Sequence, residues 1–124
     1  MITGIGIDIV YVKRMERWRA NSGLLKKYFS SDEIDLVSSR GNGAVQALAA
    51  RFAAKEAFGK ALGTGLSGIA LKDIAVVSKK NGIPEIKLSG TAQKAFEKSG
   101  SNKAHISLSH ERENAVAVVV LERA

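Results

Sequence analysis

The residues best suited to chemistry in this sequence are two carboxylates, each set in an otherwise apolar segment. Asp8 interrupts the run 4–10, which otherwise contains only glycine, isoleucine and valine, and Glu56 lies in the alanine-rich run 51–60. Burying an unpaired polar group costs about 2–7 kcal/mol even when the group is neutral, so each carboxylate needs a compensating partner. One divalent cation would compensate both, and the sequence therefore predicts a shared metal site.

Strict alternation in 4–10 predicts a strand with three isoleucines on one face and Asp8 with two glycines on the other. The glycines leave the face of Asp8 free of other side chains. This is typical of a strand that a ligand or another backbone approaches closely. The alternative is an edge strand whose aspartate meets solvent or caps the next segment.

Lys60 lies four residues after Glu56, in the order that favours an intrahelical ion pair, so a plain Glu56–Lys60 salt bridge is the alternative to a metal site. Two carboxylates beside a lysine also suit Mg²⁺ and a phosphate together, because Mg²⁺ keeps several waters and takes one or two carboxylates. Arg51 and Lys55 form a second charged stripe, about 140° around the helix from the first. They are expected to meet a different phosphate or to lie across an interface.

The composition narrows the chemistry further. A length of 124 residues predicts a single domain, 1–124, and the absence of cysteine with only two histidines excludes thiolate and His-rich metal sites. A bound metal would then be a hard, oxygen-bound ion such as Mg²⁺. The formal net charge of +7 predicts an anionic partner. Neither a leader nor a membrane-spanning stretch is visible, so we expect a cytoplasmic protein without a membrane partner.

The periodicity predicts short helices and strands around one long helix. The expected elements are a strand at 4–10, a short basic helix at 12–19, a helix that begins at a capping box at Ser30, a loop at 38–43, the long helix at 44–62, strands at 74–77 and 83–88 around Asn81-Gly82, a helix at 89–99, and a hairpin of 106–109 with 115–121. We therefore predict an α+β fold in which a small antiparallel sheet packs on one long helix, with short helices around it.

Three further features need an interpretation of their own. The basic cluster Lys13, Arg14 and Arg17 is either a solvated helix face or a docking surface for an acidic partner. By their own context, His105 and His110 are typical of surface residues flanking a strand. The glycines of 63–68 are not followed by the Lys-Ser/Thr of a phosphate-binding P-loop, so that interpretation fails.

Four segments, taken in chain order, identify a family. They are Gly4-Ile5-Gly6-Ile7-Asp8-Ile9, Arg51-Phe52-Ala53-Ala54-Lys55-Glu56-Ala57 followed by Lys60, Gly63-Thr64-Gly65, and Ile106-Ser107-Leu108-Ser109-His110. With them the sequence resembles the holo-acyl-carrier-protein synthases, the short, single-domain class of 4′-phosphopantetheinyl transferases. The resemblance spans essentially the whole chain, and the Phe-Ala-Ala-Lys-Glu-Ala block together with the N-terminal aspartate is its most specific part.

The resemblance implies the 4′-phosphopantetheinyl transferase fold and transfer of phosphopantetheine from coenzyme A to a serine of an acidic apo acyl carrier protein, with release of adenosine 3′,5′-bisphosphate. Asp8 and Glu56 would bind Mg²⁺, and Lys60 would act with them on the pyrophosphate. The implied assembly is a homotrimer with sites at subunit interfaces. The coenzyme A site would include Arg51, Lys60, His110, Gly82 and Pro84, with isoleucine at position 83 where the family usually has a basic residue.

Two alternatives stay open at this point. The proton of the serine would pass either to Glu56 or to a water on the metal. The positive charge also suits a basic RNA- or ribosome-binding module without catalysis, although none of the seven aromatic residues is interleaved with Lys or Arg in a stacking pattern. A coenzyme A sensor without turnover is a third possibility. We favour the enzyme over nucleic-acid binding, because only metal chemistry needs a buried Asp8.

Overall fold

A computed structural model describes all residues 1–124. The elements along the chain are β1 (Ile2–Tyr11), a 3-10 helix (Val12–Met15), α1 (Glu16–Arg19), α2 (Ser22–Tyr28), α3 (Ser31–Ser38), a 3-10 helix (Gly41–Gly43), α4 (Ala44–Leu62), a 3-10 helix (Leu71–Asp73), β2 (Ile74–Ser78), β3 (Pro84–Leu88), α5 (Gly90–Lys98), β4 (Lys103–His110) and β5 (Asn114–Glu122). The predicted α+β class is confirmed.

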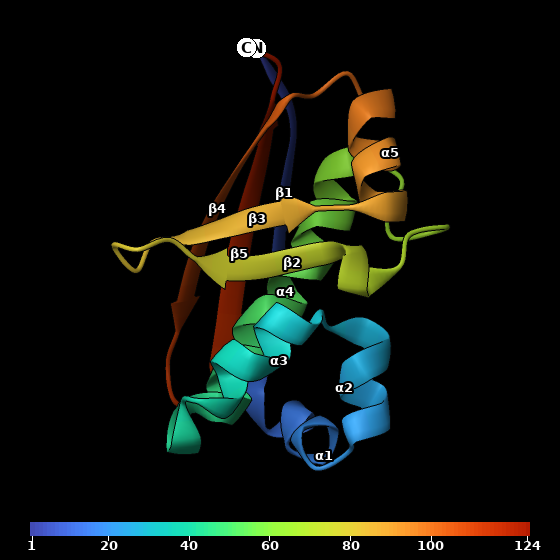
Figure 1. The fold of residues 1–124 in the computed structure, drawn as a ribbon. Coiled ribbons are helices and arrows are strands. Elements are labelled where there is room, and N and C mark those ends of the chain that lie inside the picture. The colour runs from blue at the N-terminus through green and yellow to red at the C-terminus, as the bar shows by residue number, and fades with distance from the viewer.

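The single sheet that we predicted is divided into two. Strands β1, β5 and β4 form one antiparallel sheet in that order, and β2 pairs only with β3. Helix α4 lies between them, with its long side against β1 and β5 and the β2–β3 hairpin crossing it on the other side (Figure 1). The short helices α1 to α3 gather at one end of α4, and α5 lies at the other (Figure 1).

Helix α4 is buried around most of its circumference, as the sequence predicts. Its alanines and the phenylalanines Phe52 and Phe58 form the centre of the hydrophobic core. The helix ends at Gly63, which has a φ of 82° and so takes the left-handed conformation that glycine adopts without a steric penalty. A helix enclosed in this way fixes the direction of every polar side chain that it carries.

The two glycines of β1 let the strand and α4 touch backbone to backbone. A methyl group on Gly4 would lie 1.8 Å from the carbonyl oxygen of Ala61, and one on Gly6 would lie 1.9 Å from that of Ala57. The close approach inferred from the glycines is therefore an approach of a helix. Asp8 continues the same face of the strand, so its carboxylate is delivered to α4.

The opposite face of β1 corrects our assumption that the apolar run is buried. Ile5, Ile7 and Ile9 are 66%, 59% and 61% exposed, because β1 is an edge strand of a sheet that α4 covers on one side only. Cross-strand neighbours on β5 extend this outer face with half-buried valines, Val118 opposite Ile7 among them. The alternation of residue types along β1 distinguishes its two faces, but it does not indicate which of them faces the core.

Several local boundaries differ from the prediction. The basic helix at 12–19 is a 3-10 turn followed by the short helix α1, and the expected loop at 38–43 is the end of α3 followed by another 3-10 turn. Helix α2 was not predicted. The connection between β2 and β3 contains five residues, with Gly82 at a φ of 83°.

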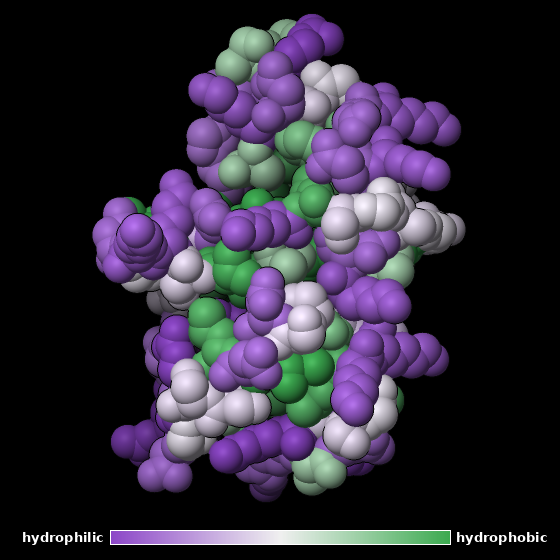
Figure 2. Space-filling model, viewed as in Figure 1, coloured by the Kyte–Doolittle hydropathy of each residue, from purple (hydrophilic) through white to green (hydrophobic).

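Hydrophilic residues cover most of the face seen in Figure 2, and hydrophobic residues are visible in the middle of it, on both sides of the hairpin. The two chain ends lie together, where the amino group of Met1 donates to the carbonyl oxygen of Arg123 at 2.8 Å (Figure 1). No helix is long and apolar enough to cross a membrane.

Candidate active site

The structure brings Asp8, Glu56 and Lys60 together where β1 crosses α4. The Nζ atom of Lys60 donates to Oδ1 of Asp8 and to the carbonyl oxygen of Ile7, at 3.0 Å each. The side chain of Asp8 is 18% exposed and that of Lys60 is 55% exposed. The ion partner of Lys60 is thus Asp8, and the plain Glu56–Lys60 salt bridge that we considered is not formed.

Glu56 is held in an environment that disfavours its charge. Burial raises the pKa of Glu56, and the negative charge of Asp8 raises it further, while Lys60 and Arg14 act in the opposite direction. Two carboxylates close enough to repel each other, and partly withdrawn from water, are a fitting donor pair for a hard divalent cation. No three or more His, Cys, Asp or Glu side chains lie together in a way that could hold a metal ion. This pair therefore suits Mg²⁺, which fills its remaining positions with water and phosphate oxygens.

The raised pKa of Glu56 predicts a measurable pH dependence of stability. A folded-state pKa above the unfolded value gives stability that is present at acidic pH and lost as the pH rises through the folded value. In EDTA at neutral pH, Glu56→Gln should therefore raise the melting temperature by about 2 °C, a small effect because the side chain is partly solvated. The difference should vanish near pH 4, and a variant less stable than the wild type at neutral pH would contradict this assignment.

A second polar feature is an open cavity of about 390 Å³ between α4, the β2–β3 hairpin and the end of β4. This volume lies within the range of about 300–1,000 Å³ that is usual for small-molecule sites. Its lining unites four of the residues that the sequence assigned to a nucleotide: Arg51, Gly82, Pro84 and His110. Lys60, the fifth, lies outside it with the carboxylates. The cavity also contains Arg40, Gln46 and Ser78, which sequence reasoning missed because they belong to no recognisable pattern.

Arg51 is a buried cation that faces this cavity. It is 4% exposed, and its Nε and Nη1 atoms donate to the carbonyl oxygens of Val76 and Ala47 at 3.1 and 3.2 Å. Its Nη2 atom makes no hydrogen bond within the chain, and Arg51 is one of the residues that line the cavity. Burial lowers the pKa of Arg51. An anion such as a phosphate in the cavity would compensate the cost of burying this positive charge.

Lys55 has a different role from the one that we expected. It is fully buried and pairs with Glu33, whose side chain is also fully buried, at 2.8 Å. We had assigned Glu33 only to the capping box of α3, which the structure confirms. Lys55 therefore neither meets a phosphate nor lies across an interface.

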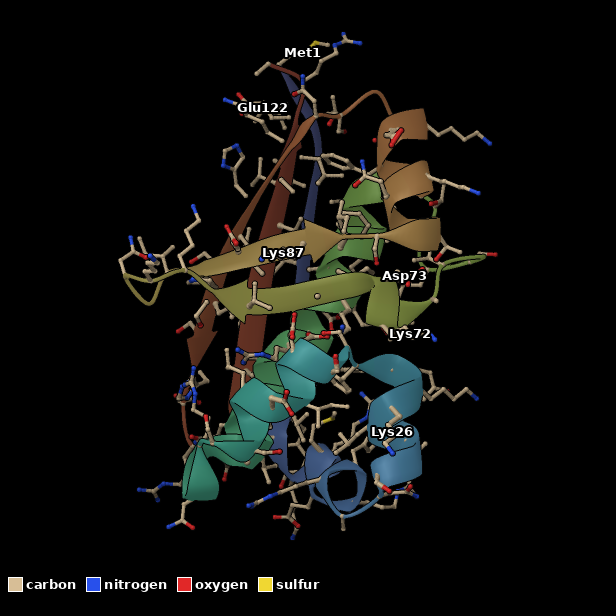
Figure 3. All side chains as sticks on the ribbon, viewed as in Figure 1. Met1, Lys26, Lys72, Asp73, Lys87 and Glu122 are labelled. Atoms are coloured by element: carbon tan, nitrogen blue, oxygen red, sulfur yellow. The ribbon has the colours of Figure 1, made fainter.

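One residue of the basic cluster, Arg14, lies near the carboxylates. Arg14 packs over the ring of Phe52 at 5.3 Å, and its positive charge reaches Glu56, where it lowers the pKa. Lys13 and Arg17 are exposed. His105, for which we expected no function, pairs with Glu122 at 2.9 Å near the chain ends, where Met1 and Glu122 are labelled in Figure 3.

An α+β fold that carries a carboxylate pair beside a lysine, and a cationic cavity lined by Arg40, Arg51 and His110, is suited to binding phosphorylated molecules. A family model described as 4′-phosphopantetheinyl transferase superfamily matches residues 4–119. The chain belongs to this family, and the resemblance drawn from its motifs is confirmed.

The relatives cover the chain almost completely. A holo-[acyl-carrier-protein] synthase from Treponema denticola is 53% identical over 98% of this chain and 99% of its own length. Among solved structures, a holo-[acyl-carrier-protein] synthase from Neisseria meningitidis superimposes with a TM-score of 0.88 at 34% identity, covering 98% of this chain and 99% of its own. One from Bacillus anthracis, in complex with CoA (3′,5′-ADP), gives 0.82 at 34% identity, covering 100% and 99%.

Proposed function

We propose that this protein transfers the 4′-phosphopantetheine group of coenzyme A to a serine hydroxyl of an apo acyl carrier protein, in a reaction that depends on Mg²⁺. The observation that carries the proposal is that a carboxylate–lysine cluster and a cationic cavity occur together in a chain that matches a holo-[acyl-carrier-protein] synthase over 98% of its length. Both features suit the two phosphorylated parts of coenzyme A, the pyrophosphate and the 3′-phosphate.

In the proposed reaction the serine oxygen attacks the phosphorus that bears the pantetheine. The bond to the leaving adenosine 3′,5′-bisphosphate breaks, and the hydroxyl proton is released. Such transfers depend mainly on positioning and charge neutralisation. Mg²⁺, held by Asp8 and Glu56, would supply charge neutralisation at the pyrophosphate. Lys60 is positioned to donate to the same oxygens, while Arg51, Arg40 and His110 hold the nucleotide phosphate.

These two groups of residues serve different parts of one substrate through two copies of the chain. Arg51 and Glu56 are five residues apart on α4 and so project about 140° from each other. The carboxylate cluster faces β1, whereas the cavity opens under the β2–β3 hairpin. A homotrimer, with the cluster of one copy next to the cavity of its neighbour, would complete the site, and the exposed isoleucines of β1 offer the surface for it.

Lys60→Ala should lower kcat by about 10–100-fold while coenzyme A binding weakens less, because negative charge builds up on the pyrophosphate in the transition state. Steady-state kinetics together with coenzyme A titration by calorimetry would separate the two effects. A change in KM alone would assign Lys60 to ground-state binding, or to its observed pairing with Asp8.

Charge reversal in the basic cluster tests the docking of the carrier protein. Arg14→Glu should raise the carrier protein KM by about tenfold and leave coenzyme A affinity almost unchanged, because charges at an interface rim mainly steer association. Raising the salt concentration should likewise raise the carrier protein KM of the wild type, because the Debye length is about 8 Å near physiological ionic strength and more salt screens these charges further. Lys94→Glu, an equal change in net charge on the exposed face of α5, is the matched control. If Arg14→Glu and Lys94→Glu had the same carrier protein KM, the cluster would be a solvated face only.

The decisive experiment is incubation with coenzyme A, Mg²⁺ and an apo acyl carrier protein, followed by intact-mass measurement. The carrier protein should gain the mass of phosphopantetheine, and EDTA or replacement of the acceptor serine by alanine should abolish the gain. Absence of transfer, together with tight coenzyme A binding, would favour the sensor without turnover.

The packing of the aromatic side chains gives no support to the RNA-binding alternative. Trp18 packs against Tyr28, Phe29 and Phe52 with ring centroids 5.1–6.3 Å apart, and Phe29 and Phe52 are buried. These aromatic side chains form a core and present no row of rings on which bases could stack.

A further inference from the structure

One edge of strand β2 has no neighbouring strand, and charged side chains form hydrogen bonds with it instead. β2 pairs only with β3, so the N–H and C=O groups on its other side need partners from elsewhere. Those partners come from helices α3 and α4. The N–H of Val76 donates to Oε2 of Glu33 at 3.1 Å, and the carbonyl oxygen of Val76 accepts from Nε of Arg51 at 3.1 Å.

The same edge is extended by Lys55. Its Nζ atom donates to the carbonyl oxygen of Ile74, the first residue of β2, to that of Leu71 at 2.9 Å, and to Oε1 of Glu33. Leu71 belongs to the turn that leads into β2, where Lys72 and Asp73 are labelled in Figure 3. Glu33, Lys55 and Arg51 thus do for this edge what a neighbouring strand would do.

These contacts determine where the hairpin lies relative to α4. Ser78, Gly82 and Pro84 at the far end of the hairpin form one wall of the cationic cavity, and Arg51 forms part of the opposite wall. A shift of the hairpin along α4 would change the distance between these walls. Arg51 belongs to the binding machinery itself, whereas Glu33 and Lys55 do not line the cavity.

The geometry points to Glu33 and Lys55 as positioning residues that hold the β2–β3 hairpin against α4 and thereby set the width of the coenzyme A cavity. This inference rests on the proposed function for its substrate, but not for the coupling between the buried pair and the hairpin. It extends to the nucleotide end of the substrate only, since the carboxylates Asp8 and Glu56 lie on the β1 side of α4.

Glu33→Gln is the sharpest test, because it keeps the shape of the side chain but removes its negative charge and its contact with the N–H of Val76. Oε1 of Glu33 accepts from both Lys55 Nζ and the N–H of Ser30, whereas Oε2 accepts only from Val76. The amide oxygen of glutamine would therefore take the Oε1 position and turn its NH₂ group toward the N–H of Val76. The contact to β2 is lost, while the hydrogen bond from Lys55 on α4 is kept. Glu97→Gln on α5, where Glu97 accepts from Gln93 at the surface, is the matched control.

Hydrogen exchange measures the coupling between Glu33 and the hairpin, and it requires no assumption about enzymatic activity. In the wild type the Val76 amide should exchange about 10³-fold more slowly than that of Lys80 in the exposed turn, after correction for intrinsic rates. Glu33→Gln should accelerate Val76 exchange by about tenfold or more, and Glu97→Gln should not. Wild-type exchange at Val76 as fast as at Lys80 would overturn the proposal even if the variant failed to fold.

Kinetics then connect the hairpin to the substrate. Glu33→Gln should raise the KM for coenzyme A by about tenfold and change kcat by less than about threefold, because binding geometry is lost at the nucleotide end only. In Glu33→Gln combined with Lys55→Met, neither member of the buried pair is left charged without the other, and Arg51 keeps its hydrogen bonds to the carbonyl oxygens of Val76 and Ala47. The melting temperature should therefore lie closer to that of the wild type than in Lys55→Met alone. The coenzyme A KM should nevertheless stay raised.

The outcomes separate the two proposals. Recovery of the coenzyme A KM together with the melting temperature in the double variant would show a merely structural pair and overturn the positioning role. Unchanged Val76 exchange and unchanged coenzyme A KM in folded Glu33→Gln would overturn it as well. A wild-type protein that transfers no phosphopantetheine would refute the proposed function alone, since the exchange measurements would still decide the positioning role.

Discussion

Asp8→Ala and Glu56→Ala are each expected to lower kcat by about 10³-fold, because a bound cation contributes several kcal/mol to transition-state stabilisation and each 1.4 kcal/mol corresponds to about a factor of ten. The proposal gives one Mg²⁺ to both carboxylates, so neither side chain alone should retain it. Kinetics at limiting and saturating Mg²⁺ would measure the loss, and Mn²⁺ binding followed by electron paramagnetic resonance would measure the metal directly.

The fold should survive both substitutions. Neither carboxylate is fully buried, and Glu56 loses an unfavourable charge when it is replaced. In Asp8→Ala, Lys60 keeps its hydrogen bond to the carbonyl oxygen of Ile7. Asp35→Ala, at an exposed position of α3, is the matched control and should leave both the rate and the Mn²⁺ affinity unchanged. A near-normal rate at limiting Mg²⁺ in either site variant would refute the shared metal.

The proximity of Asp8 and Glu56 could be predicted, because each is a carboxylate in a segment that is otherwise apolar. A carboxylate in a run of isoleucine and glycine, and another in a run of alanine, each call for a partner that the local sequence does not provide. The long helix was predictable for a related reason, since its alanine-rich composition and terminal glycine agree with each other. Local signals of this kind need no knowledge of the tertiary fold.

The partners of the charged side chains could not be predicted in the same way. Lys60 has Glu56 at the ideal helical spacing but binds Asp8, which is 52 positions away in the chain. Glu33 and Lys55 are 22 positions apart and meet only because α3 packs against α4 and β2. Helical spacing predicts which side chains can meet within an element. It does not predict which contact tertiary packing prefers.

The exposed isoleucines of β1 are the other feature that the pattern left undetermined. Apolar side chains and glycines alternate, and the usual expectation buries the apolar face. The glycine face is buried instead, because only glycine allows the α4 backbone within contact distance of the strand. The isoleucines are then left without a cover in a single chain.

That uncovered face leads to the second large effect, which is expected from Ile7→Asp. Ile7 lies between two other exposed isoleucines and opposite Val118, so the outer face of β1 and β5 is a continuous apolar surface. Such a surface on a small protein marks a site of association. If it is the interface of the proposed trimer, a carboxylate at its centre would be buried without a partner and would prevent assembly.

Light scattering at micromolar concentration should give a trimer for the wild type and a single-subunit mass for Ile7→Asp, with the circular dichroism spectrum preserved because residue 7 is 59% exposed within one chain. Leu24→Asp, the same kind of change at a partly exposed position of α2 that is remote from β1 and from the cavity, should remain trimeric. A single-subunit mass for the wild type would reject the trimer. A trimeric Ile7→Asp variant would remove this face from the interface.

Loss of assembly should also strongly lower the rate of the transfer reaction. In a single chain the carboxylate cluster and the cationic cavity face away from each other across α4, so coenzyme A would bind one of its phosphate groups at a time. We expect the transfer rate of Ile7→Asp to fall by about 10²-fold or more, the scale of loss when a substrate is no longer held in a reactive position. Mixing Ile7→Asp with wild-type protein should not restore its activity, because the carboxylate would block every interface that it enters. A monomeric variant with a normal transfer rate would instead place the entire site within one chain.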